Sequence, residues 1–289
     1  MPDYSLLEKL LFPPVHLDRE KLAACVRGKT IAITGASSGI GERLAYLMGE
    51  YEVRLILIAR REDKLRSMQK GIEGDPAMRA KVVVAAADLR NESEMNAVLS
   101  QLQQLPDGLD ILVSNAGLSI RRPIEASLER YHDFTRTMAI NYFAPVRLML
   151  ALIPVLRERK GQIINISTIN TALIPLPYWA AYQASKQAFD TWLRSAAPEL
   201  HAMGIATTSI YLPLVRTPMI EPTASYRDMP AMSADHVSQL IAKSIYSRRS
   251  RWSPWWLVFG QLASLTGRGV WERVMPGVLR KRRDKHGSS

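Results

Sequence analysis

The chain has 289 residues but only one cysteine, Cys25, so no disulfide can form within it. No His/Cys cluster has the spacing of a zinc site, and we therefore expect no bound metal. No run of eighteen apolar residues occurs, which predicts no membrane-spanning helix. The N-terminal residues lack a basic start followed by an apolar core, so no signal peptide is expected. These absences indicate the reducing cytoplasm, and an apolar content of 47% suffices for one full α/β domain.

Acidic residues are scarce at the C-terminal end. From 248 to 289 ten arginines and lysines stand against two acidic residues, which is +8 of the formal net charge of +11. Four of the six tryptophans lie there as well: Trp252, Trp255, Trp256 and Trp271. One interpretation is a solvated basic end whose tryptophans pack back on the body. The other is an edge that meets an anionic membrane surface or the phosphorylated carrier of a long acyl substrate. Nucleic acid is not expected, because no recognition motif accompanies the charge.

Apolar, strand-like segments alternate with helix-like segments along most of the chain. This order predicts a Rossmann-type, doubly wound parallel sheet with helices on both faces. We expect an N-terminal extension at 1–28, one α/β domain at 29–247 and a basic, Trp-rich appendage at 248–289. Asn91 and Ser233 are the expected helix caps, with Glu94 completing a capping box after Asn91. The expected strands are 30–34, 53–59, 81–87, 110–114, 162–166 and 205–211, and the expected helices are 39–49, 61–71, one from 91, 127–158, 178–203 and 233–247.

A glycine-rich segment, Thr34-Gly-Ala-Ser-Ser-Gly-Ile-Gly41, joins the first strand to the first helix of the domain. In a doubly wound sheet, ligands bind beyond the carboxyl ends of the strands, where this segment lies. Gly35, Gly39 and Gly41 let the backbone approach a pyrophosphate, to which the N–H groups of the following helix can donate. The alternative is a tight strand-to-helix connection without a ligand. The strand before and the helix after favour dinucleotide binding.

The end of the second strand indicates which dinucleotide binds. A carboxylate at this place would accept hydrogen bonds from the ribose 2′-OH of NAD, but the residue here is Ala59. Arg60 and Arg61 follow it, and arginine pairs well with the 2′-phosphate of NADP. Two solvated arginines at a helix start are the alternative. We predict NADP(H) in preference to NAD(H).

Tyr182 and Lys186 are four residues apart in an expected helix, so their Cβ atoms lie roughly 5–6 Å apart on one face. An ammonium close to the phenol favours the tyrosinate and would make Tyr182 an acid or base near neutral pH. Lowering a tyrosine pKa from 10 to about 7 requires roughly 4 kcal/mol, which we expect from the ammonium together with the charge of an oxidised nicotinamide. Ser167, after the fifth strand, could hydrogen-bond a carbonyl oxygen as charge develops on it, or merely cap the strand. Asn141 could hold a helix backbone open to a proton-relaying water, or simply cross-link two strands.

These motifs together resemble the short-chain dehydrogenase/reductase family from about residue 28 to 247. The matching segments, in family order, are Thr34–Gly41, Asp88, Asn115-Ala-Gly117, Asn141, Ser167, Tyr182-x-x-x-Lys186 and Pro213-Leu-Val-Arg-Thr217. The resemblance implies an NAD(P)-dependent oxidoreductase with a sheet of about seven strands, assembled as a homodimer or homotetramer. The catalytic tetrad that it implies is Asn141, Ser167, Tyr182 and Lys186.

The same resemblance implies a set of cofactor contacts. Asp88 would lie near the adenine, and Val215 and Thr217 near the nicotinamide carboxamide. Two departures from the family pattern occur: Ser114 replaces a usual asparagine, and Leu214 replaces a usual glycine beside the expected nicotinamide face, which puts the path of that loop in question. The full implied set is Gly35, Ser37, Ser38, Gly39, Ile40, Gly41, Arg60, Arg61, Asp88, Leu89, Asn115, Ala116, Gly117, Tyr182, Lys186, Val215 and Thr217.

A narrower similarity is to the bacterial fatty acyl-CoA reductases of this family. It is carried by Ser119-Ile-Arg-Arg122, His132–Met138, Asn141-Tyr-Phe143, Gly161–Ser167 and Leu212–Ile220. It implies reduction of a long-chain acyl thioester or aldehyde by NADPH, with Tyr182 as proton donor. Cys25 precedes the first strand, roughly 16 Å from the cofactor end, so no thiol-bound acyl intermediate is expected.

Two other functions stay open. The tetrad serves equally well a ketone or alcohol oxidoreductase acting on a bulky apolar substrate, hydroxyacyl or steroid-like. A non-catalytic NADP-binding scaffold is the more remote alternative. In each case we expect a cytoplasmic protein, with peripheral contact at the inner face of the membrane through residues 248–289.

Overall fold

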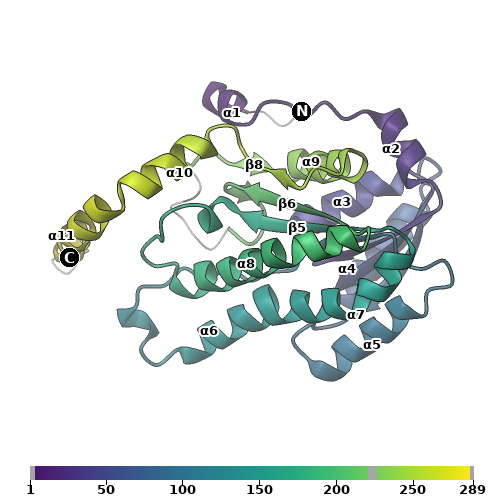
Figure 1. Ribbon diagram of the computed structural model, residues 1–289, viewed down its shortest axis with the longest axis horizontal. Coiled ribbons are helices and arrows are strands. Elements are labelled where there is room, and N and C mark those ends of the chain that lie inside the picture. Colours follow the sequence, from purple (N-terminus) through teal and green to yellow (C-terminus); the bar gives the residue numbers. More distant parts are fainter. Residues whose placement is uncertain (1–3, 221–225, 227, 287–289) are drawn as a thin grey trace.

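A parallel sheet of seven strands forms the centre of the protein, as the computed structural model in Figure 1 shows; the structure describes residues 4–220, 226 and 228–286. The strand order is β3-β2-β1-β4-β5-β6-β9, and every neighbouring pair is parallel. The order reverses between β1 and β4, so the crevice at the carboxyl ends of these two strands is where such a sheet binds ligands. The predicted fold class is confirmed. The strands are β1 Lys29–Thr34, β2 Val53–Ala59, β3 Lys81–Ala86, β4 Ile111–Ser114, β5 Gln162–Thr168, β6 Ala206–Leu212 and β9 Arg251–Trp252.

Helices cover both faces of the sheet, and alternate strand residues divide between the two layers. Ile31 and Ile33 of β1 belong to one buried apolar cluster, and Ala32 between them belongs to the other. The first cluster includes residues of α3 Gly39–Gly49, α4 Glu62–Glu73 and α9 Ala234–Ser247. The second includes residues of α5 Glu92–Gln103, α7 Ala144–Glu158 and α8 Ala180–Ala202. Because both faces are covered, the central strands are buried apolar runs, as in other parallel sheets.

The long helix expected at 127–158 begins only at Tyr131 and has three parts, which are α6 Tyr131–Met138, a π-helical segment and α7. A 3₁₀ turn at Glu125–Ser127 precedes α6, and the π-helical segment at Ala139–Phe143 separates α6 from α7. By length and composition the stretch Tyr131–Glu158 could cross a membrane, contrary to the expectation that no such helix exists. Its second half is instead a core helix here, since Leu148, Leu152 and Leu156 are buried in the second cluster.

The helix that carries Tyr182 begins at Ala180, two residues later than expected. Tyr178 has a φ of 71°, in the left-handed region that a bulky residue rarely adopts, so it cannot belong to the helix. Its carbonyl oxygen accepts a hydrogen bond from the Arg122 backbone N–H at 2.7 Å, which holds this conformation. Such conformations persist only where the surroundings impose them, often next to functional sites.

Both end segments take part in the core or sheet. In the N-terminal segment, Phe12 follows α1 Leu6–Leu11, and Leu22 and Val26 belong to α2 Arg19–Val26; all three are buried in the first cluster. In the C-terminal segment, β9 pairs with β6 through Ser209–Arg251 and Ile210–Trp252, so the sheet continues beyond the predicted domain end at 247. A strand of two residues is too short to show the alternation of apolar residues by which strands are predicted from a sequence. Then α10 Leu257–Thr266 and α11 Arg268–His286 project from the body (Figure 1).

A second, small sheet lies where the sixth strand leaves the crevice. It consists of β7 Val215–Arg216 and β8 Met232–Ser233, paired in parallel. The backbone N–H of Met232 donates to the Leu214 carbonyl oxygen at 2.9 Å, so Leu214 is held by this pairing. The pairing therefore holds the ends of the segment between these two strands close together.

Candidate active site

The glycine-rich turn between β1 and α3 is packed so tightly that side chains would not fit. A Cβ atom at Gly41 would lie 2.5 Å from the Gly35 carbonyl oxygen, and one at Gly35 would lie 2.9 Å from the Ala116 Cα. Gly35 and Gly39 also have φ values of 67° and 59°, which favour glycine. Ser38 caps α3 without a side-chain hydrogen bond in the described part of the chain. The turn thus presents a helix N-terminus and bare backbone to an anion.

Asn115, after β4, braces this turn. Its side-chain amide donates to the Thr34 carbonyl oxygen at 2.9 Å, and its backbone N–H donates to the Thr34 hydroxyl at the same distance. The Thr34 hydroxyl also accepts from the Ala116 N–H at 3.0 Å. The amide of Asn115 therefore joins the ends of β1 and β4 at the point where strand order reverses.

Positive charge gathers at the ends of β2 and β3. Arg61 donates to the Ser37 hydroxyl at 3.2 and 3.0 Å and to its carbonyl oxygen at 3.0 Å, so the guanidinium lies beside the glycine turn. Arg60 lies 4.0 Å from Asp88 and is largely exposed. Arg90, which the sequence analysis missed, donates to Asp88 at 2.9 Å and, by that bond, holds the pKa of the carboxyl below its usual range. The position of Arg90, two residues after the expected adenine contact Asp88, could have indicated from the sequence that it belongs to the site.

Glu94 positions Asp88 rather than completing the expected capping box. Asn91 does cap α5, because its side-chain oxygen accepts from the Ser93 and Glu94 N–H groups. The Glu94 carboxylate, however, accepts from the Asp88 backbone N–H at 2.7 Å instead of turning back to Asn91. The N-terminus of α5 therefore holds the end of β3 in place.

Tyr182 and Lys186 lie on α8 and face the crevice. Burial raises the pKa of Tyr182 to about 12, against a smaller lowering by a hydrogen bond with Thr168. Burial likewise lowers the pKa of Lys186 to about 8. The Lys186 ammonium donates to the Ile166 carbonyl oxygen at 3.1 Å. In the chain without a dinucleotide, desolvation of the phenolate outweighs what the neighbouring side chains supply. The acidification of Tyr182, which also depends on the charge of an oxidised nicotinamide, stays a prediction.

Ser167 and Asn141 are the other two residues of the predicted tetrad. Ser167 is a buried residue of β5 itself, with its hydroxyl 3.4 Å from the Thr171 hydroxyl. Asn141 lies in the π-helical segment, and its side chain bonds both backbone groups of Leu118, at 2.9 and 2.8 Å, and the Ser185 hydroxyl at 2.9 Å. The amide thus links the loop after β4 to α8, rather than linking two strands. In a π-helical turn the backbone carbonyl oxygens accept from N–H groups five residues later instead of four. The hydrogen bonding of the backbone around Asn141 is therefore changed, as the predicted access of a water to this backbone requires.

One cavity of about 810 Å³ brings most of the predicted residues together. Of the predicted set, only Gly41, which supports the turn from behind, and Asn141 do not line it. The side chain or backbone of Leu214 does line it. The predicted residues along the cavity are Gly35, Ser37, Ser38, Gly39, Ile40, Arg60, Arg61, Asp88, Leu89, Asn115, Ala116, Gly117, Ser167, Tyr182, Lys186, Val215 and Thr217.

Aromatic residues that the sequence analysis did not single out extend the site outwards from Tyr182. The Trp179 ring meets the Tyr182 ring edge-on, with 5.6 Å between the ring centroids, and stacks on the Tyr226 ring, with 6.1 Å between the centroids. Trp179 and Tyr226 line the same cavity with Leu173, Met219 and Met229. Apolar and aromatic side chains predominate at this end of the cavity, although Arg121 also lies near Tyr226, whereas Arg60, Arg61 and Arg90 line the other end. The position of Trp179, three residues before Tyr182, was a usable signal, but Tyr226 is brought in only by folding.

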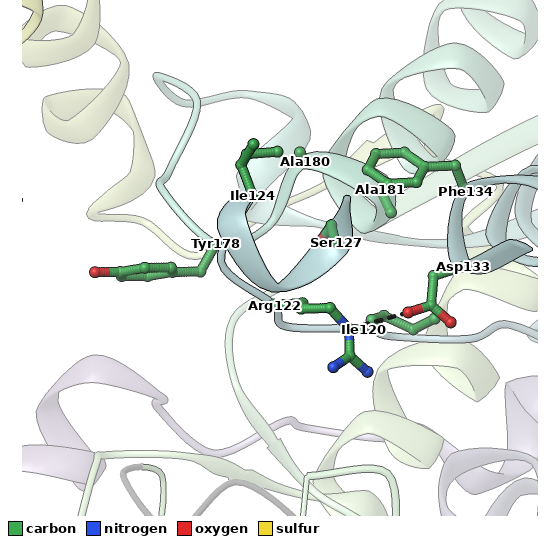
Figure 2. Close-up of a pocket in the computed structure, with 9 residues that line it drawn as sticks. All are labelled: Ile120, Arg122, Ile124, Ser127, Asp133, Phe134, Tyr178, Ala180 and Ala181. Atoms are coloured by element: carbon green, nitrogen blue, oxygen red, sulfur yellow. Dashed lines mark hydrogen bonds and ion pairs between the residues drawn. The ribbon is translucent and has the colours of Figure 1, made fainter. Parts of the chain in front are cut away.

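A buried carboxylate anchors the loop that borders this end. Asp133 on α6 accepts from Arg122 and Arg130, each at 3.0 Å, and the bond from Arg130 keeps the pKa of Asp133 low despite burial. Figure 2 shows Arg122 reaching Asp133 while the Tyr178 side chain points away from both. The loop from β4 to α6 is therefore tied to the start of α6.

Comparison with known proteins places the chain in a family. A family model described as short chain dehydrogenase matches residues 29–228. A fatty acyl-CoA reductase of Acinetobacter baylyi is 40% identical over 242 residues, 83% of this chain and 80% of that protein. A fatty acyl-CoA reductase of Mycobacterium tuberculosis is 38% identical over 228 residues, 78% of this chain and 76% of that protein.

Solved structures agree. The L-sorbose reductase of Gluconobacter frateurii, solved with NADPH and L-sorbose, superposes with a TM-score of 0.68 at 26% identity, covering 77% of this chain and 91% of that one. The family match covers the turn, the crevice and the Tyr182–Lys186 helix described above. The chain is therefore an NAD(P)-dependent oxidoreductase that belongs to the short-chain dehydrogenase/reductase family, similar to its fatty acyl-CoA reductases.

Proposed function

We propose that this protein uses NADPH to reduce the carbonyl of a long-chain fatty acyl thioester, or of the related aldehyde, with Tyr182 as the acid. The observation that carries the proposal is the single cavity that joins a cationic, glycine-lined end to an apolar, aromatic end, with Tyr182 between them. The 40% identity to a fatty acyl-CoA reductase over most of both chains supports the acyl substrate.

The residues present suit a phosphorylated dinucleotide. Gly35, Ser38 and Gly39 line the cavity at the start of α3, where backbone N–H groups can donate to a pyrophosphate. Arg61 and Arg60 follow β2, where the ribose of a bound dinucleotide would lie, and no carboxylate occupies the Ala59 position. Guanidinium groups pair with a 2′-phosphate, which supports NADP(H) as the preferred cofactor.

The chemistry that we derive for the chain centres on proton supply. When bound, the reduced nicotinamide supplies a hydride to the carbonyl carbon. Tyr182, with a pKa of about 12, is protonated at neutral pH and donates its proton to the carbonyl oxygen as charge develops there. Ser167 donates a hydrogen bond to the same oxygen. Lys186 keeps a positive charge below about pH 8, which favours proton release from Tyr182.

For a thioester, the product of this step is a hemithioacetal. Its C–S bond breaks as the hydroxyl proton passes to sulfur, which leaves an aldehyde and a thiol, and solvent returns a proton to Tyr182. No cysteine takes part, because the chain has only Cys25. The Cys25 thiol lies on α2, 3.9 Å from the Ile245 carbonyl oxygen of α9, and does not line the cavity. The acyl group is therefore reduced without first being transferred to the protein.

The test is to incubate purified protein with NADPH and dodecanoyl-CoA, follow NADPH absorbance and identify dodecanal by gas chromatography. We expect aldehyde formation, and a loss of about 10²–10⁴ in kcat for Tyr182→Phe with NADPH binding retained. If acyl-CoAs of every chain length are inert while bulky ketones are reduced, the ketone reductase is the correct function. If Tyr182→Phe leaves every measured activity unchanged, the non-catalytic scaffold becomes the leading explanation.

The cofactor preference has its own test. Arg61→Gln should raise KM for NADPH by about ten-fold or more and leave KM for NADH unchanged, because only NADPH has the 2′-phosphate. Arg66→Gln on α4 is the matched control, since it removes an exposed guanidinium that pairs with Glu62 instead. Equal changes for both cofactors would argue against a 2′-phosphate contact.

Assembly and location remain predictions. A homodimer or homotetramer, a cytoplasmic place and peripheral contact with the inner face of the membrane are part of the proposal. Exposed apolar side chains on α10, such as Phe259 and Leu265, together with the basic charge of α11, support contact with anionic lipid. Deleting residues 257–289 keeps β9 in the sheet, whereas deleting from 248 would remove it. Unchanged binding to phosphatidylserine vesicles after deletion of residues 257–289 would contradict the lipid contact.

A further inference from the structure

Besides Lys186, the cavity carries two separate groups of arginines, and the dinucleotide accounts for only one of these groups. Arg60, Arg61 and Arg90 follow β2 and β3, on one side of the point where strand order reverses. Arg121, in the loop after β4, and Arg136, on α6, line the cavity from the other side of that point. Among the described residues that line the cavity, Asp88 alone is a carboxylate, and Arg90 and Arg60 already engage it.

Arg121 is held at the aromatic end of the cavity. Its guanidinium lies over the Tyr178 ring at 5.0 Å from the centroid. Burial raises the pKa of Tyr226, and the charge of Arg121 partly offsets that rise, so this charge reaches the ring that stacks on Trp179. Trp179 in turn touches Tyr182. The rings of Tyr182, Trp179 and Tyr226 thus form a row of neighbours, and the charge of Arg121 acts on the outer ring of that row.

The backbone is strained to make this arrangement. Tyr178, whose ring supports Arg121, is one of three non-glycine residues with positive φ in the described chain. The backbone N–H of Arg122, next to Arg121, holds the Tyr178 carbonyl oxygen at 2.7 Å. Arg122 itself is fixed by Asp133 (Figure 2). Strain maintained by such connections is typical of residues that present a functional group.

Arg136 adds a second charge that its own neighbours only partly balance. It lies 3.9 Å from Asp133, but that carboxylate is bonded at 3.0 Å by Arg122 and Arg130. About half of the Arg136 side chain is exposed, and it borders the cavity. A single negative charge shared among three guanidinium groups leaves net positive charge at this wall.

From these contacts we propose that Arg121, assisted by Arg136, binds phosphate on the thiol carrier to which the acyl chain is attached, either coenzyme A or the phosphopantetheine of a carrier protein. The inference rests on the proposed function, because it concerns the carrier of the proposed acyl substrate. The phosphate of the carrier would bind the two arginines, and the acyl chain would lie against the apolar side chains of the same cavity, which are Leu173, Trp179, Met219 and Met229. Arginine recognises phosphate through two parallel N–H donors, and a cavity wall excludes part of the competing water. The phosphopantetheine can come from free coenzyme A or from a carrier protein.

The experiment compares three thioesters with the same reacting group: dodecanoyl-CoA, dodecanoyl-4′-phosphopantetheine and dodecanoyl-pantetheine, which carries no phosphate. For Arg121→Gln we expect KM for dodecanoyl-CoA to rise about ten-fold or more, with kcat nearly unchanged, and KM for dodecanoyl-pantetheine to stay within about two-fold. A loss confined to dodecanoyl-CoA assigns the contact to the nucleotide phosphates. A loss shared by the phosphopantetheine thioester assigns it to the phosphate that a carrier protein would also present.

Arg147→Gln on α7 is the matched control, because it removes a guanidinium that pairs with Glu92 and Asn96 and does not line the cavity. Arg121→Lys keeps the charge without the paired donors and should lie between wild type and Arg121→Gln. Equal KM changes for all three thioesters, or the same effect from Arg147→Gln, would overturn the proposal.

Binding without turnover separates this inference from the proposed function. Calorimetry with coenzyme A alone, on the NADPH-loaded protein, should show binding that Arg121→Gln weakens about ten-fold or more and that 0.5 M salt also weakens. If no thioester is reduced but this binding is seen, the phosphate site stands and the reductase proposal fails. If thioesters are reduced while wild type binds no coenzyme A and Arg121→Gln changes no KM, the phosphate site fails and the reductase proposal stands.

Discussion

The buried carboxylate of Glu8 ties the N-terminal helix α1 to both ends of the loop between β7 and β8. It accepts from the Ala231 N–H at 3.0 Å and from the Ser5 N–H at 3.0 Å, and it pairs with Arg216. Arg216 ends β7 and Ala231 precedes β8, while Met219 and Met229 between them line the cavity. Glu8→Ala should therefore destabilise the protein and loosen the wall of the substrate end.

The magnitude follows from the groups left behind. Ala231 is 1% exposed, so its N–H would lose its partner inside the protein, at about 1–3 kcal/mol. Arg216 is 46% exposed and can turn to water, so its lost ion pair adds about 1 kcal/mol at most. We expect about 1–4 kcal/mol less free energy of unfolding for Glu8→Ala. Glu8→Gln keeps an oxygen for Ala231 and should cost about half as much.

Urea unfolding at pH 7 measures the stability, and KM for dodecanoyl-CoA measures the loop. Hydrogen bonds from Ala231 and Ser5, with the Arg216 charge, outweigh burial and lower the pKa of Glu8. Its stabilising contribution is therefore present above the unfolded value near 4.5 and lost as pH falls, so the difference between wild type and Glu8→Gln should shrink at pH 3–4. Glu20→Ala, an exposed carboxylate on α2, is the control. If Glu8→Ala matches Glu20→Ala in both unfolding and KM, the tether does not hold the loop.

Three further predictions concern the site and its support. Because burial lowers the pKa of Lys186 to about 8, kcat/KM for carbonyl reduction should fall as pH rises through about 8; a profile flat from pH 7 to 10 would contradict this. Asp133→Asn should lower the free energy of unfolding by about 1–3 kcal/mol at pH 7, and, since the pKa of Asp133 is lowered, by less at pH 3, as urea unfolding at the two pH values would show. Gly41→Ala places a Cβ 2.5 Å from the Gly35 carbonyl oxygen and should weaken NADPH binding about ten-fold, as fluorescence titration can measure, whereas Gly269→Ala, with open space around it, should not.

Local patterns predicted what depends on local physics. The glycine turn could be inferred because tight backbone approach excludes side chains wherever it occurs, and the structure shows that exclusion at Gly35 and Gly41. The first helix of the domain was predicted at 39–49 and lies at Gly39–Gly49. The Ser233 cap was also predicted correctly, with its hydroxyl accepting from the His236 N–H. Each of these involves residues within a few positions of one another.

The predictions that failed depend on distant residues. Two residues, Arg251 and Trp252, form the seventh strand only because β6 offers them an edge. Tyr178 leaves the helix because the Arg122 backbone, 56 positions earlier, holds it in a left-handed conformation. The spacing of Tyr182 and Lys186 is visible in the sequence, whereas the burial that raises the pKa of Tyr182 is not. Desolvation depends on every element packed around a group.

The order of strands, helices and motifs along the chain by itself determined the family, the parallel sheet and the residues at the carboxyl edge of that sheet. These features could be predicted because the spacing of apolar residues and the small residues of turns are properties of short stretches of sequence. Tertiary structure alone decided which charges meet. It brought Glu8 to Arg216, Arg90 to Asp88, and Arg121 to the rings beside Tyr182. Coulomb and hydrogen-bond energies depend on distance and on exclusion of water, and both quantities exist only once the chain has folded.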